Sequence, residues 1–180
     1  SLPKTSASAL LTGMTTDTGN THLTRIVDDL AEQGWSLQPQ FIAQTLTHEL
    51  AEECRKRAAQ GALVPAGVGR GVQSQIREGV RGDHIQWLEV GQDASCDKYL
   101  QALDELRTVL NQGLYLGLED VEAHFALYRP GAFYQKHMDC FRDDDRRAVS
   151  VVLYLNEDWR AEQGGALRLY LPNGEMRDVL

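Results

Sequence analysis

The chain has 180 residues, 42% of them hydrophobic and 24% charged, which suits one globular domain with a buried core. Its formal net charge of −8 argues against the phosphate backbone of a nucleic acid as the main partner. No apolar run approaches the ~20 residues that a membrane helix needs, and the start of the chain lacks the long apolar core of a signal peptide. The cysteines, Cys54, Cys96 and Cys140, form no CxxC pair, so the sequence predicts neither a disulfide framework nor a zinc site and favours a reducing cytoplasm.

The N-terminal half is predicted to be helical after a loose start. Residues 1–20 are rich in Ser, Thr and Gly, which predicts a flexible N-terminal segment, with Met14 as a candidate native start. Thr21 and Ser95 are of the residue types that cap helix N-termini. Apolar residues at helical spacing then predict three helices, over 21–34, 40–61 and 95–113.

The second half of the chain is predicted to be rich in strands. Residues 65–83 are rich in Gly and read as a long functional loop, without the strand-and-helix context of a dinucleotide fingerprint. A short strand is predicted over 84–90, and four β-rich segments follow, "VEAHFALYRPG", "YQKHMD", "AVSVVLYLN" and "GALRLYL". Helices followed by strands predict helices packed against an antiparallel sheet or barrel, an α+β or mainly β fold, and argue against a βαβ arrangement.

The stretch Tyr134-Gln135-Lys136-His137-Met138-Asp139 contains the main candidate for chemistry. In a strand, His137 and Asp139 would project from the same face, because residues i and i+2 share a face. An imidazole, a carboxylate and one further His form the facial triad of non-haem Fe(II) oxygenases, which leaves positions open for a co-substrate and O₂. Taken alone, His-x-Asp is a common triplet, and a solvated polar pair is the simpler interpretation.

The motifs around this pair resemble those of the hypoxia-inducible-factor type prolyl hydroxylases, which are Fe(II)- and 2-oxoglutarate-dependent dioxygenases. The matching pieces are "YRPGAFYQKHMD", "VLYLNEDW", "GGALRLY" and "RGDHIQWLE", within a resemblance that covers about residues 40–180. The resemblance implies a double-stranded β-helix, or jelly roll, with N-terminal supporting helices. It implies a dioxygenase domain over 21–180 that lacks its C-terminal strands.

The resemblance also implies roles for individual residues. His137 and Asp139 match two iron ligands, with catalytic roles. The residues that match the 2-oxoglutarate pocket are Tyr128, Tyr154, Val152 and Leu167. Those that match the substrate side are Tyr134, Arg81 and Trp87. Without the resemblance, the tyrosines and apolar residues would be ordinary core positions, the arginine a loop anchor and the tryptophan a packing residue.

The family pattern continues with a second iron-binding His and an Arg that pairs with the 2-oxoglutarate carboxylate. No histidine follows His137 in this chain, so the resemblance implies that the third ligand, a His, lies beyond Leu180. Either the natural protein continues or the chain is a truncated form, and two ligands alone would hold Fe(II) poorly. The expectation for the 180 residues by themselves is therefore weak or absent activity.

The implied function is hydroxylation of a prolyl residue in an intracellular protein, with Fe(II), 2-oxoglutarate and O₂, and with ascorbate as a further candidate cofactor. The compact acidic chain favours a bacterial member, and bacterial enzymes of this type are associated with translation elongation factor Tu as substrate. Two alternatives stay open: a non-catalytic jelly-roll binding module and a small-molecule amino-acid hydroxylase. The sequence indicates no nucleic-acid partner and no membrane partner.

Overall fold

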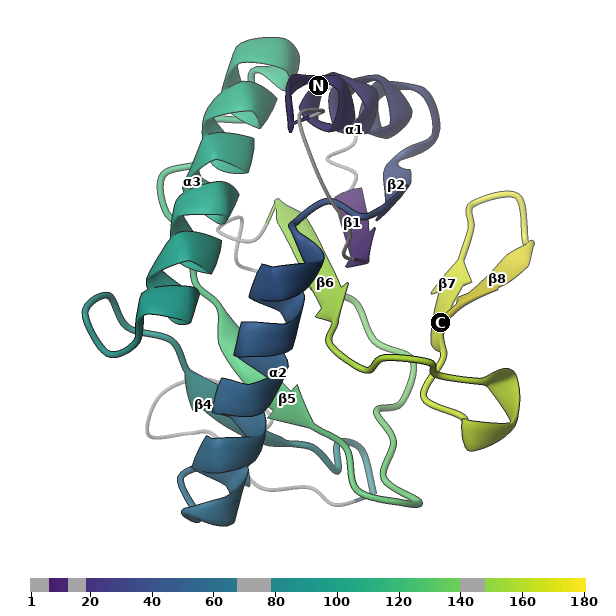
Figure 1. Cartoon of the computed structure of the whole chain (residues 1–180). Helices are drawn as coiled ribbons and strands as arrows, with labels where there is room; N and C mark the ends of the chain where they lie inside the picture. Colours follow the sequence, from purple (N-terminus) through teal and green to yellow (C-terminus); the bar gives the residue numbers. More distant parts are fainter. Residues whose placement is uncertain (1–6, 13–18, 68–78, 140–147) are drawn as a thin grey trace.

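The computed structural model describes residues 7–12, 19–67, 79–139 and 148–180, and Figure 1 shows the arrangement of their helices and strands. The helices are α1 Gly19–Gln33, α2 Gln44–Ala59, α3 Ala94–Leu114 and the 3-10 turn η2 Ala161–Gln163. The strands are β1 Ala7–Thr12, β2 Trp35–Pro39, β3 Val64–Pro65, β4 His84–Trp87, β5 His124–Leu127, β6 Val149–Tyr154, β7 Leu167–Tyr170 and β8 Met176–Val179. Within these ranges, no helix is long and apolar enough to cross a membrane.

The three predicted helices are confirmed, but two predicted caps are wrong. Thr21 lies inside α1, which begins at Gly19. Helix α3 is capped by Asp93, whose side chain accepts hydrogen bonds from the backbone N–H groups of Ser95 and Cys96, so the prediction of Ser95 as the cap is wrong. Helix α3 also continues past Gly113 to Leu114, and Tyr115 ends it in the left-handed conformation. Gly113 serves packing instead, because a Cβ at this position would lie 2.6 Å from Cγ1 of Val27 in α1.

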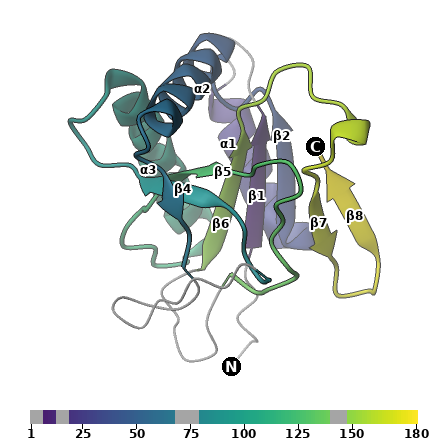
Figure 2. The same ribbon diagram turned by 90° about the horizontal axis from the view of Figure 1, so that it is seen from below.

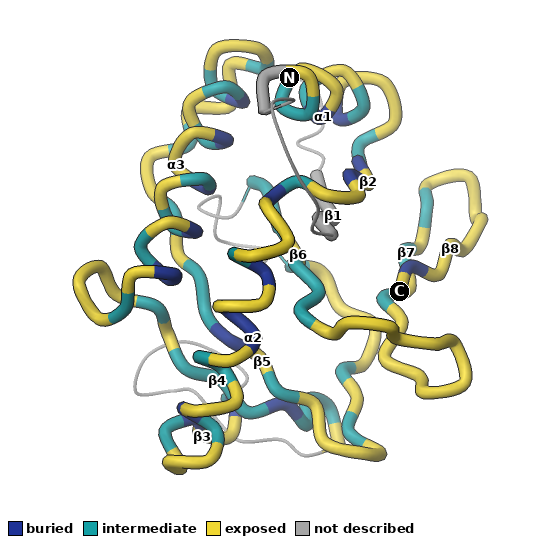
Figure 3. The backbone as a smooth tube through the Cα atoms, viewed as in Figure 1, coloured by how far each residue is buried: buried dark blue, intermediate teal, exposed yellow. Residues whose placement is uncertain are grey.

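The helices bury their apolar faces in two adjoining clusters. The first cluster joins α2, α3 and β5 through Ile42, Leu50, Leu63, Cys96, Tyr99, Leu103 and Phe125. The second joins α1 to α3 through Ile26, Leu30, Leu106 and Leu110. Figure 3 shows these buried positions recurring along one side of α3, as expected for an amphipathic helix. Val151 and Leu153 of β6 pack against both clusters and so tie the sheet to the helices.

The first sheet differs from the expected antiparallel arrangement. Its strand order is β2-β1-β6, and β1 pairs in parallel with both neighbours. Helix α1 lies between β1 and β2 in the chain, so these elements form the kind of βαβ unit that the order of elements had argued against. The flexible segment expected over 1–20 also differs at Ala7–Thr12, where backbone pairing makes a strand of a Ser-, Ala- and Leu-containing stretch. Residues 1–6 and 13–18, with Met14, lie outside the described residues.

The remaining strands pair as expected for antiparallel structure. Strands β3, β4 and β5 form one antiparallel sheet, and β7 and β8 form a hairpin. Figure 2 shows the hairpin beside β2 and away from α2 and α3. Cζ of Arg177 lies 4.7 Å from the centre of the Trp35 ring, which attaches the hairpin to β2. Most of the Gly-rich loop predicted over 65–83, residues 68–78, lies outside the described residues.

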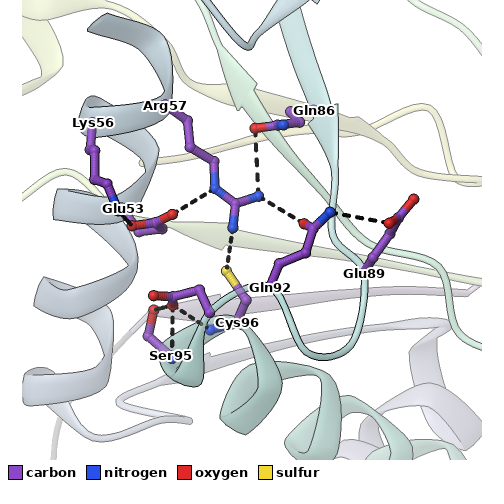
Figure 4. Close-up of polar contacts among 9 residues, drawn as sticks. Glu53, Lys56, Arg57, Gln86, Glu89, Gln92, Ser95 and Cys96 are labelled. Atoms are coloured by element: carbon purple, nitrogen blue, oxygen red, sulfur yellow. Dashed lines mark hydrogen bonds and ion pairs between the residues drawn. The ribbon is translucent and has the colours of Figure 1, made fainter. Parts of the chain in front are cut away.

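A buried arginine joins the helices to the β4 sheet (Figure 4). Arg57 of α2 is 6% exposed, and its Nε donates a hydrogen bond to Glu53 at 2.8 Å. Its remaining nitrogens reach Gln86 on β4, Gln92 and Cys96. This network therefore holds the start of α3 and the strand β4 against α2, and β4 leads back to the candidate site.

Candidate functional site

His137 and Asp139 lie side by side, although they do not lie on a strand. The predicted "YQKHMD" strand is wrong: Tyr134 forms an isolated bridge with Arg81, and the residues after it form a bend and irregular backbone. Nevertheless Nε2 of His137 lies 3.1 Å from Oδ1 of Asp139, and the two side chains are 35% and 41% exposed. The short spacing in the chain, and not a shared strand face, is what lets the two groups meet.

The orientation of the His137 ring is set by its other nitrogen. Nδ1 lies 2.6 Å from the backbone carbonyl of Gln135. A carbonyl only accepts hydrogen bonds, so Nδ1 must carry a proton and Nε2 is the nitrogen presented to Asp139. The hydrogen bond to Asp139 raises the pKa of His137, partial burial opposes this, and the Gln135 carbonyl raises it further. This is the arrangement in which a metal-binding histidine is usually held, with the far nitrogen anchored by an acceptor.

The donor atoms fit a divalent metal ion. Two adjacent ligand atoms of an octahedral ion with bonds of about 2.1 Å lie about 3.0 Å apart, and the observed separation of Nε2 of His137 and Oδ1 of Asp139 is 3.1 Å. A neutral imidazole and a carboxylate are also the ligand types of non-haem Fe(II). Among the described residues, however, no group of three or more His, Cys, Asp or Glu side chains could hold a metal ion. Among the described residues His137 and Asp139 are therefore a pair of candidate ligands, and their role in metal binding stays a prediction.

Tyr134 stacks on His137, and Arg81 lies on Tyr134 in turn. The rings of Tyr134 and His137 are stacked, with centroids 3.6 Å apart and planes inclined by 18°. Cζ of Arg81 lies 4.8 Å from the centre of the Tyr134 ring. The structure thus brings together four of the residues that the motifs had predicted for the site, Arg81, Tyr134, His137 and Asp139.

Tyr128 and Tyr154 lie near the same group. The pairing of β4 with β5, continued by one residue past His84 and Leu127, sets Tyr128 opposite Asp83. Burial raises the pKa of Tyr128, and the charge of Asp83 raises it further, while Tyr134 and Tyr154 are close enough to contribute. The hydroxyl of Tyr154 donates to the carbonyl of Gly165 at 3.1 Å.

Val152 and Leu167 are placed around Tyr154. Val151 and Leu153 face the helices, so alternation along β6 puts Val152 and Tyr154 on the opposite face, and Val152 is 36% exposed. The hydroxyl of Tyr154 lies 3.1 Å from the carbonyl of Gly165, two residues before Leu167, and 3.4 Å from the carbonyl of Val179, the partner of Leu167 in the hairpin, which places β7 beside the end of β6. These two apolar residues and Tyr154 are therefore neighbours, as a shared pocket wall requires.

Trp87 is not brought to the metal-binding pair. It stands at the far end of β4, and six residues of extended chain from Arg81 span about 20 Å. Its ring packs edge-on against His124, the residue opposite it in β5, with centroids 4.9 Å apart. A packing role accounts for this geometry, and a substrate contact by Trp87 stays a prediction.

Two residues beside the pair, Asp83 and Lys136, were not predicted from the sequence. Asp83 is 1% exposed and accepts two hydrogen bonds from the guanidinium of Arg81. Nζ of Lys136 lies 3.9 Å from the centre of the Tyr170 ring and so links the segment of the pair to β7. The contact of Asp83 with Arg81 could have been predicted from the triplet Arg81-Gly82-Asp83. Opposite charges two residues apart in extended chain lie on the same face.

Comparison with known proteins identifies the group to which this arrangement belongs. Residues 123–179 match the family model of the 2OG-Fe(II) oxygenase superfamily. The chain is similar to the crystal structure of a Pseudomonas putida prolyl-4-hydroxylase, with 49% sequence identity, a TM-score of 0.77, and coverage of 88% of this chain and 81% of that one. It is 31% identical over 158 residues to prolyl hydroxylase EGLN3 of Homo sapiens and 28% identical over 162 residues to Egl nine homolog 1 of Homo sapiens.

Each of these curated relatives is matched over 83% of this chain, whereas the chain spans 64% of the length of the first and 36% of the second. The matched region of the family model contains the His137–Asp139 pair, both tyrosines of the predicted co-substrate pocket, and β7. Sequence identity and shared fold agree. The chain belongs to the prolyl hydroxylase family within the 2OG-Fe(II) oxygenase superfamily.

Proposed function

We propose that the full-length protein binds Fe(II) and 2-oxoglutarate and hydroxylates a prolyl residue of a protein, with O₂ as the second co-substrate and ascorbate as a candidate reductant. The observation that carries this proposal is the pair Nε2 of His137 and Oδ1 of Asp139, 3.1 Å apart, with Nδ1 of the imidazole anchored on the Gln135 carbonyl. That geometry leaves a nitrogen and a carboxylate oxygen directed at a common point. The family assignment supplies the identity of the metal and the co-substrate.

The residues of this chain would bind and orient the reactants. His137 and Asp139 would hold the iron, which with 2-oxoglutarate supplies the oxidising chemistry when it is bound. The face of β6 that carries Val152 and Tyr154, together with Leu167, would form an apolar wall with a phenol beside the co-substrate. Because burial raises the pKa of Tyr154, its hydroxyl stays protonated at neutral pH and keeps a proton to donate to a carboxylate.

The jelly-roll fold and the domain limits belong to the same proposal. The faces of β4, β5 and β6 that point away from α2 and α3 carry Trp87, Ala126, Tyr128 and Val152, all of them exposed. In a jelly roll, such a face lines the space between two sheets. We propose a dioxygenase domain made of residues 21–180 together with β1, because β1 lies between β2 and β6 in the first sheet.

The substrate is proposed by family likeness, and the match to a prolyl-4-hydroxylase of Pseudomonas putida favours a bacterial protein target, for which elongation factor Tu is the candidate. Tyr134 stacks on His137 and Arg81 lies over the Tyr134 ring, which supports a role for both in contacting a substrate that approaches the metal. A cytoplasmic location would follow from such a target.

The deciding measurement is succinate formation from 2-oxoglutarate with Fe(II), in the presence of elongation factor Tu, of free proline, or of neither. Turnover that requires the protein, with one prolyl residue gaining the mass of an oxygen atom, supports the proposal. Turnover with the free amino acid would support the small-molecule alternative instead. His137→Ala is expected to abolish turnover in either case, because it removes a ligand.

A second candidate function is a non-catalytic jelly-roll binding module. It is favoured by one observation, that the described residues provide only two metal ligands and contain no group of three. Absence of Fe(II) binding in an anaerobic titration, together with unchanged binding by His137→Ala, would select this alternative.

A further inference from the structure

Five side chains form a continuous stack that leads from the buried sheet to the candidate metal ligands. Asp83 accepts hydrogen bonds from Nε and Nη2 of Arg81 at 2.7 and 3.0 Å. The guanidinium lies 4.8 Å from the centre of the Tyr134 ring, and that ring stacks on His137 with centroids 3.6 Å apart. His137 then meets Asp139 at 3.1 Å. Exposure of the side chains rises along the stack, from 1% at Asp83 and 16% at Arg81 to 35% at His137.

Backbone hydrogen bonds hold the segment of Arg81 beside the segment of Tyr134. The N–H of Gly82 donates to the carbonyl of Phe133, and the N–H of Gln135 donates to the carbonyl of Val80, both at 2.9 Å. A Cβ on Gly82 would lie 3.3 Å from Cβ of Ala132, so the two segments run closely side by side. The side-chain amide of Gln135, whose backbone carbonyl anchors the His137 ring, also donates to the carbonyl of Gly79.

We propose that Asp83 and Arg81 are positioning residues that orient the imidazole of His137 through the ring of Tyr134. The inference rests on the proposed role of His137 as an iron ligand. A guanidinium fork bonded through two nitrogens to one carboxylate has a defined plane, whereas a free arginine side chain samples many rotamers. The fixed plane presents one face to Tyr134, and the stacked phenol in turn limits rotation of the partly exposed imidazole about χ2.

A purely structural role for the Asp83–Arg81 pair makes a different prediction. If the pair only fastened residues 79–83 to residues 132–135, its loss would lower stability and leave the His137 ring as it is. If the pair acts through Tyr134, its loss frees the ring, weakens the hydrogen bond to the Gln135 carbonyl and exchanges the protonated nitrogen. The nitrogen that carries the proton is therefore the readout that separates the two roles.

The first experiment measures the ring nitrogens of His137 by NMR of 15N-histidine-labelled protein at pH 8, without metal. The parent is expected to show one ring environment with a proton on Nδ1, because the Gln135 carbonyl only accepts, while Nε2 shares a proton with Asp139. Asp83→Asn and Arg81→Lys are expected to show a mixture of both tautomers, because an amide or an ammonium cannot reproduce the planar fork. The matched control is Asp104→Asn, which removes the carboxylate that Arg107 contacts at 2.8 Å on α3 and should leave His137 unchanged.

The second experiment titrates the same proteins with Co(II) and follows visible absorption. Loss of an outer partner of a metal-binding histidine typically weakens metal affinity about 10- to 100-fold, and this is the expected loss for Asp83→Asn and Arg81→Lys. In a Tyr134→Leu background, Arg81→Lys should cause no further loss, because the connection is already broken. Circular dichroism identifies the variants that fold. If Asp83→Asn does not fold, Arg81→Lys still tests the inference, because it keeps a cation beside the buried carboxylate of Asp83.

Retention of the Nδ1 proton and of Co(II) affinity in folded Arg81→Lys would overturn the inference. If Arg81→Lys weakened Co(II) affinity in the Tyr134→Leu background as much as in the parent, the inference would also be overturned, because the effect would not pass through Tyr134. Failure of the proposed function looks different: the parent would bind no Co(II), or His137→Ala would bind it equally well, while the NMR result would still decide whether Asp83 and Arg81 orient the ring.

Discussion

Nε2 of His137 lies 3.1 Å from Oδ1 of Asp139, on a segment that is not a strand. The two residues are separated by one position in the chain, and the imidazole is anchored at its other nitrogen by the Gln135 carbonyl two residues before it. Local chain geometry is therefore sufficient to bring two donor atoms together, and the stacked Tyr134 ring adds a contact from outside the triplet.

We expect His137→Ala to abolish metal binding and to leave the fold intact. The side chain is 35% exposed and fills no part of either apolar cluster, so the free energy of unfolding should change by no more than about 0.5 kcal/mol. Anaerobic calorimetric titration with Fe(II) and urea denaturation measure the two effects. His48→Ala is the control, because His48 is a 58% exposed histidine on α2, and it should bind metal like the parent. Undiminished metal binding by His137→Ala would contradict the assignment of the site.

Arg57→Met should destabilise the protein strongly. Arg57 is 6% exposed and donates to Glu53, whose side chain is 12% exposed, so the substitution leaves a largely buried carboxylate with only the exposed Lys56 as an ionic partner. Breaking such a pair costs about 3–5 kcal/mol, measured as the loss of free energy of unfolding in urea. The control is Arg55→Met on the same helix, whose pair with Glu52 is 60% and 61% exposed and should contribute no more than about 1 kcal/mol. If Arg57→Met and Arg55→Met lost the same free energy of unfolding, burial of the Arg57–Glu53 pair would not be the cause.

The same network predicts a dependence of stability on acid. The hydrogen bond from Arg57 holds the pKa of Glu53 below its ordinary value. A carboxyl with a lower pKa in the folded state than in the unfolded state stabilises the fold above the unfolded pKa, and this contribution is lost as the pH falls through the lowered folded pKa. Urea denaturation between pH 6 and pH 3 should therefore show a smaller loss of stability in Arg57→Met than in the parent. A parallel decline in both proteins would refute the link to Arg57.

Cys96 should be inert as a thiol in the folded protein. It is completely buried, and burial raises its pKa to about 11. Only about one thiol in a thousand would then be ionised at pH 8, and the thiolate is the reactive form. Labelling with iodoacetamide followed by peptide mass spectrometry should modify Cys96 only after denaturation. Because its folded pKa is raised, the stabilisation that depends on the protonated thiol is present below the unfolded pKa of 9.0 and is lost as the pH rises toward about 11.

Gly113→Ala should lower stability although alanine is the better helix former. The new Cβ would lie 2.6 Å from Cγ1 of Val27, so α1 and α3 would have to separate. Overpacking of this kind costs about 1–3 kcal/mol, while the gain in helix propensity is about 1 kcal/mol. Val27→Ala shortens the opposing side chain. In that background, Gly113→Ala should leave the thermal stability unchanged or raise it. If Gly113→Ala is equally harmful in both backgrounds, close contact with Val27 is not the cause.

The helices could be predicted from the sequence because their periodicity is a local property. The cap of α3 was misplaced by two residues, since both Asp93 and Ser95 are cap-forming types and only the backbone geometry distinguishes them. The strands β1, β2, β3 and β8 were missed because short strands depend on the partners with which they pair, and a sequence pattern does not reveal partners. The parallel pairing of β1 with β2 and β6 likewise depends on segments far apart in the sequence.

For the site, the amino-acid sequence by itself determined which donor types are present and how closely they follow one another, because one intervening residue limits how far His137 and Asp139 can separate. It also carried the family motifs on which the roles of Tyr128, Tyr134 and Tyr154 depend. Only the tertiary structure decided that Asp83 and Arg81, some fifty residues earlier in the chain, reach His137 through Tyr134, and that Trp87 packs on His124 instead. Such contacts depend on how β4 pairs with β5 and how residues 79–83 meet residues 132–135, and these pairings are set by packing of the whole chain.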